Sequence, residues 1–334
     1  MVITRTPFRI SFFGGGTDYP VWYKNYGRGA ALSATINKYC YLSVRHLPPF
    51  FEHKSRVVWS KIESVKEIDE IQHPSAREIL KFLNIRKGVE IHHNADLPAR
   101  SGLGSSSSFS VGLLHALHAL DGKMVTKRKL ALDAIYVEQE RLKENVGSQD
   151  QVAAAFGGFN KIEFGGPQEI SVRPIVLNSE KLNLFQDHLM FFFTGLSRNA
   201  SDVAAEQIKN THKKTVELEA MLKMTEEALK ILNKNDSLDD FGKLLDENWK
   251  FKKSLSSQIS TDYIDDIYNA GMEAGALGGK LLGAGGGGFI LFFVRPEQQE
   301  RVREKLKKLL YVPVRFENLG SQIIYYAPEH SFQY

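Results

Sequence analysis

The sequence has little that points to an extracellular or membrane protein. Its 334 residues include a single cysteine, Cys40, so no disulfide can form within the chain. The segment Met1–Arg5 lacks the basic and then apolar run of a signal peptide. No apolar stretch approaches the ~20 residues that a transmembrane helix needs. We therefore expect a cytoplasmic protein with no membrane partner, in which Cys40 is a buried structural thiol.

A long block of basic residues is also absent. The 43 Lys and Arg residues nearly balance the 39 Asp and Glu residues, and the net charge is +4. This pattern does not indicate a nucleic-acid partner. A mildly positive protein does suit small anionic substrates such as ATP or sugar phosphates.

The chain is longer than one hydrophobic core usually organises, so we expect two domains, 1–172 and 173–334. Strands are predicted at 1–13, 30–45, 56–60, 88–93, 189–194, 289–294, 312–316 and 322–326. Helices are predicted at 75–83, 109–120, 127–144, 150–156, 200–232, 238–254, 261–274 and 297–309. Strands and helices alternate irregularly, which favours two α+β domains over a regular βαβ array.

A glycine- and serine-rich loop, Gly102–Ser108, lies between an extended segment and a helical pattern that starts at Phe109. A helix start offers unpaired N–H groups and a partial positive charge, and glycines let the backbone approach a phosphate closely. The serines are expected to cap the helix and to leave hydroxyls for phosphate oxygens or Mg²⁺. The loop therefore predicts a phosphate site. An ordinary N-cap or a linker is the alternative, and the apolar periodicity at Phe109 disfavours the linker.

Two other glycine-rich stretches resemble nucleotide-binding motifs but do not meet their requirements. The stretch 275–281 is one residue short of a Walker A loop and lacks its hydroxyl. Gly283, Gly285 and Gly288 match GxGxxG, but here a predicted helix precedes the glycines and a strand follows them. A dinucleotide site needs the opposite order.

Acidic residues that phosphoryl transfer could use follow the loop. The reaction needs a metal ligand and a group that orients or deprotonates the attacking hydroxyl. Glu138, inside a predicted helix, and Asp150, in a turn that opens the next one, are candidates. From the residues alone, a glutamate inside a helix, such as Glu138, is more often a solvated side chain, and Glu140 and Glu144 are alternative candidates at neighbouring positions. Asp150 is equally readable as a helix cap.

Taken together, three segments resemble the GHMP kinase family, which includes galactokinase, homoserine kinase and mevalonate kinase. The segments 97–107, 147–158 and 280–288 are similar to the family's PxxxGLGSS phosphate loop, its catalytic-aspartate segment and its C-terminal glycine motif. They occur in the family's order, and the resemblance covers nearly the whole chain. It implies a two-domain fold, an N-terminal α+β domain and a C-terminal ferredoxin-like domain, with the active site in the cleft between them.

The resemblance also implies roles for particular residues, with ATP and Mg²⁺ as the cofactors. Asp150 would act as the base or orient the acceptor hydroxyl, and Arg9 would keep Asp150 ionised and stabilise the phosphoryl group. Ser106 and Glu138 would bind Mg²⁺. The phosphate loop would bind nucleotide through Pro98, Arg100, Ser101, Gly102, Leu103, Gly104, Ser105, Ser106 and Ser107. The third glycine motif comprises Gly283, Ala284, Gly285, Gly286 and Gly287.

The turn after the first strand carries the expected sugar contacts, Gly15, Gly16, Thr17, Asp18 and Tyr19. An Asp in such a turn can accept sugar hydroxyls or simply stabilise the turn. Galactokinases have an acidic residue and a histidine where this chain has two glycines, which leaves room for a bulkier sugar. The amino-acid sequences of segments 6–20, 96–108 and 193–204 are most similar to the branch of the GHMP kinase family that phosphorylates the anomeric hydroxyl of D-glycero-D-manno-heptose 7-phosphate. That reaction leads to nucleotide-activated heptose for surface polysaccharides.

Arg198 would then meet the sugar phosphate, although a solvated arginine at a helix start is the plain alternative. The runner-up function is an anomeric kinase for an unphosphorylated sugar such as fucose or another hexose. The fold also hosts an ATP-using diphosphate decarboxylase, which the sugar-type first motif disfavours. A non-catalytic nucleotide-binding regulator is disfavoured because Arg9, Ser106, Glu138 and Asp150 are all present.

Overall fold

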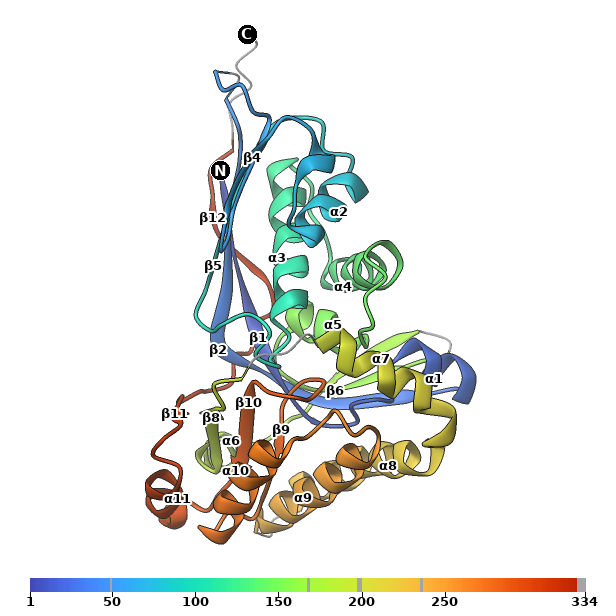
Figure 1. The fold of residues 1–334 in the computed structure, drawn as a ribbon, viewed down its shortest axis with the longest axis vertical. Helices are drawn as coiled ribbons and strands as arrows, with labels where there is room; N and C mark the ends of the chain where they lie inside the picture. The colour runs from blue at the N-terminus through green and yellow to red at the C-terminus, as the bar shows by residue number, and fades with distance from the viewer. Residues whose placement is uncertain (49, 167–168, 197–199, 235–236, 329–334) are drawn as a thin grey trace.

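The computed structural model describes all residues except 49, 167–168, 197–199, 235–236 and 329–334. Two parts are stacked along the long axis of the molecule (Figure 1). One is a long sheet with helices on one face, and the other is a smaller sheet with helices of its own. The α+β fold expected from the sequence is confirmed.

The larger sheet has eight strands within the described residues. Its order is β12-β1-β2-β5-β3-β4, while β6 pairs with the first half of β2 and β7 pairs with β6. The strands are β1 (Val2–Phe13), β2 (Gly29–His46), β3 (Ser55–Val58), β4 (Ile62–Val65), β5 (Val89–Ala95), β6 (Phe159–Phe164), β7 (Ile170–Pro174) and β12 (Gln322–Tyr326). The long β2 thus serves two neighbours, β5 on its second half and β6 on its first.

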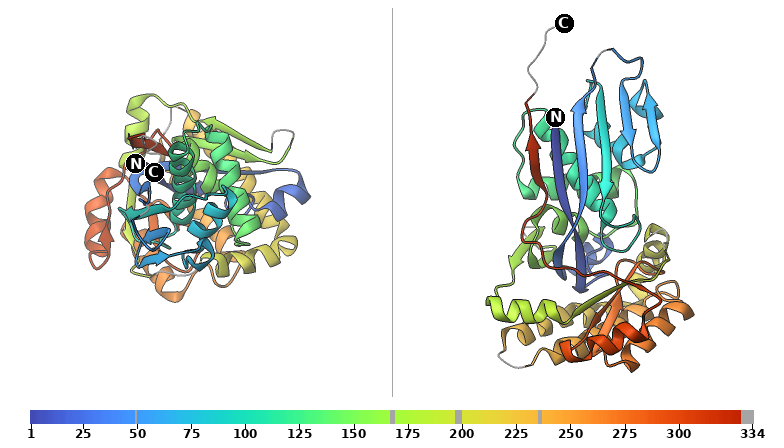
Figure 2. Two further views of the ribbon diagram at one scale, coloured as in Figure 1. Left: turned by 90° about the horizontal axis from the view of Figure 1, so that it is seen from above. Right: turned by 90° about the vertical axis from the view of Figure 1, so that its left-hand side faces the viewer.

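One face of this sheet is covered by α2 (Pro74–Phe82), α3 (Ser105–Leu120), α4 (Lys127–Tyr136) and α5 (Gln149–Phe156). Figure 2, in its right-hand view, shows the upper part of the opposite face without a helix in front of it. Helix α3 buries an almost continuous apolar surface and packs against β1 and β2. The predicted helix 127–144 ends earlier, because α4 passes into a π-helical turn at Val137–Arg141. Such turns often occur at functional sites.

The smaller sheet has the order β11-β8-β10-β9 and is antiparallel. Its strands are β8 (Leu189–Phe193), β9 (Gly278–Leu281), β10 (Phe289–Phe293) and β11 (Leu310–Tyr311). The helices of this part are α6 (Ser179–Asp187), α7 (Ala200–Asn210), α8 (Thr215–Asn233), α9 (Asp239–Ser254), α10 (Asp262–Glu273) and α11 (Gln299–Lys305). Strand β10 is entirely buried, as its apolar run predicts. None of the described helices is both long and apolar enough to cross a membrane.

Two predicted elements are wrong. The single helix 200–232 is broken into α7, a 3-10 turn at Thr211–Lys213, and α8. The Thr211 hydroxyl donates to the Gln207 carbonyl oxygen, a bond that competes with regular helix geometry. The strand at 312–316 does not form, because β11 stops at Tyr311 and the chain then crosses to the larger sheet. There Phe316 makes an isolated bridge to Ile36. Helix α1 (Pro20–Tyr26), α6 and strands β4, β6, β7, β9 and β11 were not predicted.

Strand β12 returns to the larger sheet and pairs antiparallel with β1, with Val2 opposite Tyr326. The Ser321 hydroxyl before it lies 2.9 Å from the Thr6 hydroxyl and 3.0 Å from His115 Nδ1. Residues 322–326 therefore belong to the sheet of the N-terminal half, and β7 spans the expected division at 172. The limits 1–172 and 173–334 remain a prediction that does not include this return.

A cluster of buried phenylalanines joins the two parts. Phe185 of α6 lies at its centre, with ring centroids 5.6 Å from Phe12 of β1, 4.8 Å from Phe241 of α9 and 5.6 Å from Phe293 of β10. Edge-on and tilted contacts of this kind add to the burial of apolar area. The two parts therefore share a hydrophobic core at their junction.

We expect Phe185→Ala to lower the free energy of unfolding by about 3–5 kcal/mol, because it removes a fully buried ring and leaves a cavity. Denaturant titration followed by circular dichroism measures this change. The control is Leu184→Ala, whose side chain is half exposed and should lose less than about 1 kcal/mol. Equal losses in the two variants would contradict a shared core centred on Phe185.

Candidate active site

A cavity of about 780 Å³ lies between the two parts of the molecule. Its lining comes from β1, the turn after β1, the phosphate loop, α3, α5, α7, α9 and β9. This volume is within the range of small-molecule sites. The expected cleft between the halves is therefore present.

The phosphate loop forms the start of α3, but its serines do not cap that helix. Gly104 is the N-cap residue in a left-handed conformation, and it makes no side-chain cap. The Ser105 hydroxyl instead accepts a hydrogen bond from the Arg100 N–H at 3.3 Å. The first N–H groups of a 16-residue helix consequently have no side-chain cap, and Ser105, Ser106 and Ser107 line the cavity. This arrangement favours anion binding.

The phosphate loop touches the third glycine motif through bare backbone. A Cβ atom on Gly102 would lie 2.3 Å from the Leu282 carbonyl oxygen, and one on Gly283 would lie 2.5 Å from Gly102 Cα. Both glycines have positive φ. The Phe289 N–H also donates to the Ser101 carbonyl oxygen at 3.1 Å. The third motif therefore acts as the support on which the phosphate loop rests.

Arg9 and Asp150 form a bidentate ion pair across 141 positions of the sequence. Arg9 Nε and Nη2 lie 2.7 and 2.6 Å from the two Asp150 oxygens, and Nη1 donates to the Gly102 carbonyl oxygen at 2.8 Å. Arg9 is almost fully buried, while the Asp150 side chain keeps 25% of its surface exposed. The pair therefore fixes Asp150 beside the phosphate loop with one side open to the cavity.

Asp18 lies next to Asp150 and is held by backbone. Its carboxylate accepts from the Gly16 N–H at 3.0 Å and the Gln149 N–H at 3.4 Å. Gly147 has no room for a Cβ, which would lie 1.9 Å from Asp18 Oδ2. Burial and the Asp150 charge raise the pKa of Asp18 to about 6, against the lowering effect of the backbone bonds. The turn 147–150 thus brings both carboxylates together.

Glu138 is fully buried on the π-helical turn and lies behind the loop serines. The Ser107 hydroxyl and the Gln151 amide donate to Oε2 at 2.9 and 2.5 Å, while Oε1 is buried and without a hydrogen-bond partner in the described structure. Burial raises the pKa of Glu138 to about 7, although neighbouring hydrogen bonds lower it. The structure thus pairs Glu138 with Ser107, and Mg²⁺ binding by Ser106 and Glu138 stays a prediction. The free oxygen fits a cation ligand.

Two buried lysines in the cavity lining were not predicted as site residues. Lys252 of α9 donates to the Gly283 carbonyl oxygen, and Lys280 of β9 donates to the Phe12 carbonyl oxygen at 2.8 Å. Burial and the nearby Arg9 lower the pKa of Lys252 to about 8, while Asp18 and Asp150 raise it. Burial and the neighbouring cations lower the pKa of Lys280 well below its usual range. Nothing in the run Lys250, Lys252, Lys253 marks Lys252 as the one that faces inward.

The cavity brings together most of the predicted contacts. Those that line it are Arg9, Gly15, Gly16, Asp18, Tyr19, Arg100, Gly102, Gly104, Ser105, Ser106, Ser107, Asp150, Gly283 and Ala284. The Thr17 hydroxyl lies in the turn, where it donates to the carbonyl oxygens of Gly14 and Ala30. The other predicted residues that are absent from the described lining are Pro98, Ser101, Leu103, Glu138, Gly285, Gly286 and Gly287. Arg198 lies outside the described residues.

One end of the cavity is aromatic. His73 stacks on Phe109 with ring centroids 4.4 Å apart, Trp59 meets His73 edge-on at 4.9 Å, and His93 meets Phe109 at 5.1 Å. Burial lowers the pKa of His73 to about 4, so this ring is neutral at pH 7. A flat, uncharged part of a ligand could stack against the rings at this end of the cavity.

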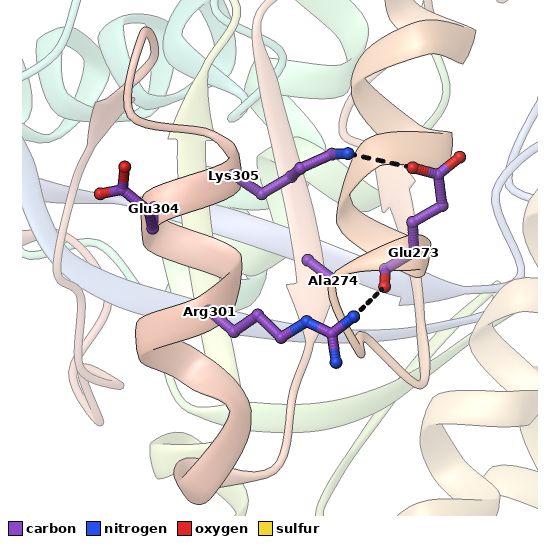
Figure 3. Close-up of a pocket in the computed structure, with 5 residues that line it drawn as sticks. All are labelled: Glu273, Ala274, Arg301, Glu304 and Lys305. Carbon is purple, nitrogen blue, oxygen red and sulfur yellow. Dashed lines mark hydrogen bonds and ion pairs between the residues drawn. The ribbon is translucent and has the colours of Figure 1, made fainter.

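A second hollow lies between α10 and α11 (Figure 3). Its two cations are paired, because Lys305 Nζ lies 3.1 Å from Glu273 Oε2 and Arg301 donates to the Glu273 carbonyl oxygen at 3.2 Å. Among the described residues, its lining contains no hydroxyl, thiol or buried carboxylate. The reactive groups are therefore concentrated in the first cavity.

Comparison with known proteins agrees with this geometry. Residues 71–158 match the model of the GHMP kinases N terminal domain, and residues 224–312 match that of the GHMP kinases C terminal domain. A D-glycero-alpha-D-manno-heptose 7-phosphate kinase of Campylobacter jejuni is 31% identical over 91% of this chain and 93% of its own length. The chain belongs to the GHMP kinase family. This GHMP kinase is accordingly an ATP-dependent phosphotransferase.

Two further relatives of this GHMP kinase are informative. The L-fucokinase/L-fucose-1-P guanylyltransferase of Bacteroides fragilis is 26% identical over 92% of the chain, which covers 35% of that longer protein. A crystal structure of a D-glycero-D-manno-heptose 1-phosphate kinase from Bacteroides thetaiotaomicron superposes with a TM-score of 0.73 at 24% identity. It covers 98% of this chain and 100% of the other. That likeness supports the fold.

Glu138→Gln should stabilise the ligand-free, metal-free protein at alkaline pH. The folded-state pKa of Glu138 is raised from 4.5 to about 7, so its ionised form costs folding free energy as pH rises through that window. We expect the variant to gain about 2 kcal/mol in unfolding free energy at pH 8, and less at pH 5.5. Denaturant titration at both pH values provides the measurement.

The matched control is Glu140→Gln, whose side chain is 56% exposed on the same π-helical turn. It should change stability by less than about 0.5 kcal/mol at either pH. A Glu138→Gln variant that is less stable than the native protein at pH 8 would contradict a net cost of burying the Glu138 charge.

Proposed function

We propose that this kinase transfers the γ-phosphate of ATP to the anomeric hydroxyl of D-glycero-D-manno-heptose 7-phosphate, giving the 1,7-bisphosphate for nucleotide-activated heptose. The observation that carries the reaction is Asp150, fixed by Arg9 between the phosphate loop and the Asp18 turn. The sugar assignment draws on the full-length likeness to the Campylobacter jejuni heptose kinase. A cytoplasmic location is part of the same proposal.

The nucleotide is proposed to lie along the α3 end of the cavity. Its phosphates would meet the uncapped first turn of α3, where N–H groups and the helix dipole favour negative charge. Its base would lie at the aromatic end formed by Trp59, His73, His93 and Phe109. The phosphate chain then points toward Arg9 and Asp150.

The acceptor is proposed to lie on the other side of Asp150. Asp18 offers a buried carboxylate for sugar hydroxyls, and Tyr19 and Gly15 line the same region. A Cβ on Gly15 would have only Gln149 Nε2 near it, at 3.9 Å, so this position leaves space. That space fits a sugar larger than a hexose.

Mg²⁺ is proposed to bind at Glu138 and Ser106. The unpartnered Oε1 of Glu138 supplies a buried carboxylate oxygen, and the exposed Ser106 hydroxyl is on the cavity wall one position before Ser107. When bound, the ion would neutralise charge on the nucleotide phosphates. The residues themselves are a single buried carboxylate and a hydroxyl, which matches the preference of Mg²⁺ for few protein ligands.

In the transfer, the anomeric oxygen attacks the γ-phosphorus, the bond from that phosphorus to the bridging oxygen breaks, and ADP leaves. Asp150 orients the hydroxyl and receives its proton. Both Asp150 oxygens already accept from Arg9, which holds the carboxylate in one orientation. The Arg9 charge also favours the negative phosphoryl group in the transition state.

An anomeric kinase for an unphosphorylated hexose such as fucose is the second candidate. The observation that favours it is the likeness to the Bacteroides fragilis fucokinase protein. Both candidates share the reaction at Asp150 and differ in whether the acceptor carries a phosphate.

A panel of acceptors separates the two candidates. We expect heptose 7-phosphate to give a new anomeric phosphate signal in phosphorus NMR together with one ADP per product. Fucose, galactose and mannose should react at least tenfold more slowly. Faster turnover of a free hexose than of heptose 7-phosphate would overturn the substrate assignment.

Asp150→Asn should lower kcat by about 10²–10⁴-fold while leaving the affinity for ATP within a fewfold of native, because it removes the proton acceptor and not the phosphate loop. Steady-state kinetics and calorimetric titration of a non-hydrolysable ATP analogue measure the two quantities. Asp121→Asn, an exposed acid after α3, is the control and should behave as native. Native-like kcat in Asp150→Asn would remove Asp150 from the mechanism.

A further inference from the structure

The buried lysine on α9 has a position that its hydrogen bonding does not explain. Lys252 is 6% exposed, comes from the C-terminal half, and reaches into the cavity that the N-terminal half lines with Arg9, Asp18 and Asp150. Its one hydrogen bond in the described structure is to the Gly283 carbonyl oxygen. An ammonium group has three donors, and burying it without a charged partner is costly.

The charges around Lys252 do not cancel. Arg9 from β1 and Lys280 from β9 are the neighbouring cations, and Asp18 and Asp150 are the neighbouring anions. Both Asp150 oxygens are taken by Arg9, and Asp18 is held by backbone N–H groups. Neither acid therefore forms an ion pair with Lys252 in the described structure. An anionic ligand would supply the missing partner.

The carbonyl oxygens to which Arg9 and Lys252 donate indicate where that anionic ligand would bind. Arg9 is bonded to the carbonyl oxygen of Gly102, and Lys252 to that of Gly283, and these two glycines are in direct backbone contact. The two cations therefore flank the junction of the phosphate loop and the third glycine motif. The end of a nucleotide phosphate chain that meets Asp150 would lie at this junction.

We propose that Lys252 is a further catalytic residue of this kinase, whose ammonium contacts the phosphoryl group in transfer together with Arg9. The inference rests on phosphoryl transfer at this site, the central part of the proposed function, and holds for any acceptor hydroxyl. Lys280 differs, because its ammonium is bonded to the Phe12 carbonyl oxygen across the junction of the two halves.

The first test compares nucleotides with and without the γ-phosphate. Lys252→Met keeps the apolar stem and removes the charge. We expect it to weaken binding of a non-hydrolysable ATP analogue by about tenfold or more, in calorimetric titrations with Mg²⁺, and to leave ADP binding unchanged. Equal losses for the two nucleotides would overturn the proposal, because they indicate a structural role.

The second test is turnover with whichever acceptor the native enzyme uses best. We expect Lys252→Met to lower kcat by about 10²–10³-fold, with a smaller change in the KM for the acceptor. A kcat within twofold of native would overturn the proposal. If the native enzyme prefers a hexose, the heptose assignment fails. The kcat values of Lys252→Met and native enzyme are then compared with that hexose as the acceptor, and the proposal for Lys252 is still tested.

The control is Lys253→Met, one position along α9. Lys253 is partly exposed and pairs with Asp265 at 2.9 Å, outside the cavity lining. It should bind both nucleotides and turn over as the native enzyme does. Circular dichroism and thermal unfolding show whether each variant is folded.

The pH profile gives a readout that does not depend on the methionine variant. In the free enzyme the pKa of Lys252 is lowered to about 8, so native kcat/KM, which reports groups of the free enzyme, should fall as pH rises through that value. Of the facing groups, Asp18 titrates near 6 and acts on the acid side, while Arg9, Asp150 and Lys280 are the same in the native enzyme and in the variant. Lys252→Arg should move the alkaline fall above pH 9. An alkaline fall at the same pH in Lys252→Arg and native enzyme would overturn the proposal.

Discussion

The contact between Gly102 and Gly283 is the constraint on which the rest of the site depends. Two backbones meet with no space for a side chain, and this contact joins the phosphate loop of the N-terminal half to the glycine motif of the C-terminal half. Arg9 and Lys252 each bind a carbonyl oxygen of this pair. The positions of Asp150, both cations and the start of α3 therefore depend on one junction, and the phenylalanine cluster joins the same two halves.

The site concentrates charge where water has little access. Asp18, Glu138, Lys252 and Lys280 are all buried, and burial shifts each pKa toward the neutral form. Such an arrangement is unfavourable in the empty protein and favourable once anionic phosphates and a cation are added. The buried charges consequently lower the free energy of unfolding of the ligand-free protein. The same charges are already in position when substrates bind, so the site would need little reorganisation.

How much the sequence could predict depended on how local each feature is. The phosphate loop is contiguous, so glycine, serine and the helical pattern after it were enough. Arg9 and Asp150 are 141 positions apart, and only the resemblance to a family linked them. Lys252 was missed because its inward orientation is set by how α9 packs on β9. The break at Thr211–Lys213 was missed because no proline or glycine marks it in the sequence.

The return of β12 to β1 has a consequence for how the chain acquires its structure. Strand β1 is synthesised more than 300 residues before its outer neighbour, β12 (Gln322–Tyr326), and Val2 pairs with Tyr326. Until those residues are synthesised, β1 is an edge strand with unpaired N–H and C=O groups. The sheet that carries Arg9 thus closes only after the smaller sheet has been made, and a chain cut before Gln322 exposes a strand edge that is prone to aggregation.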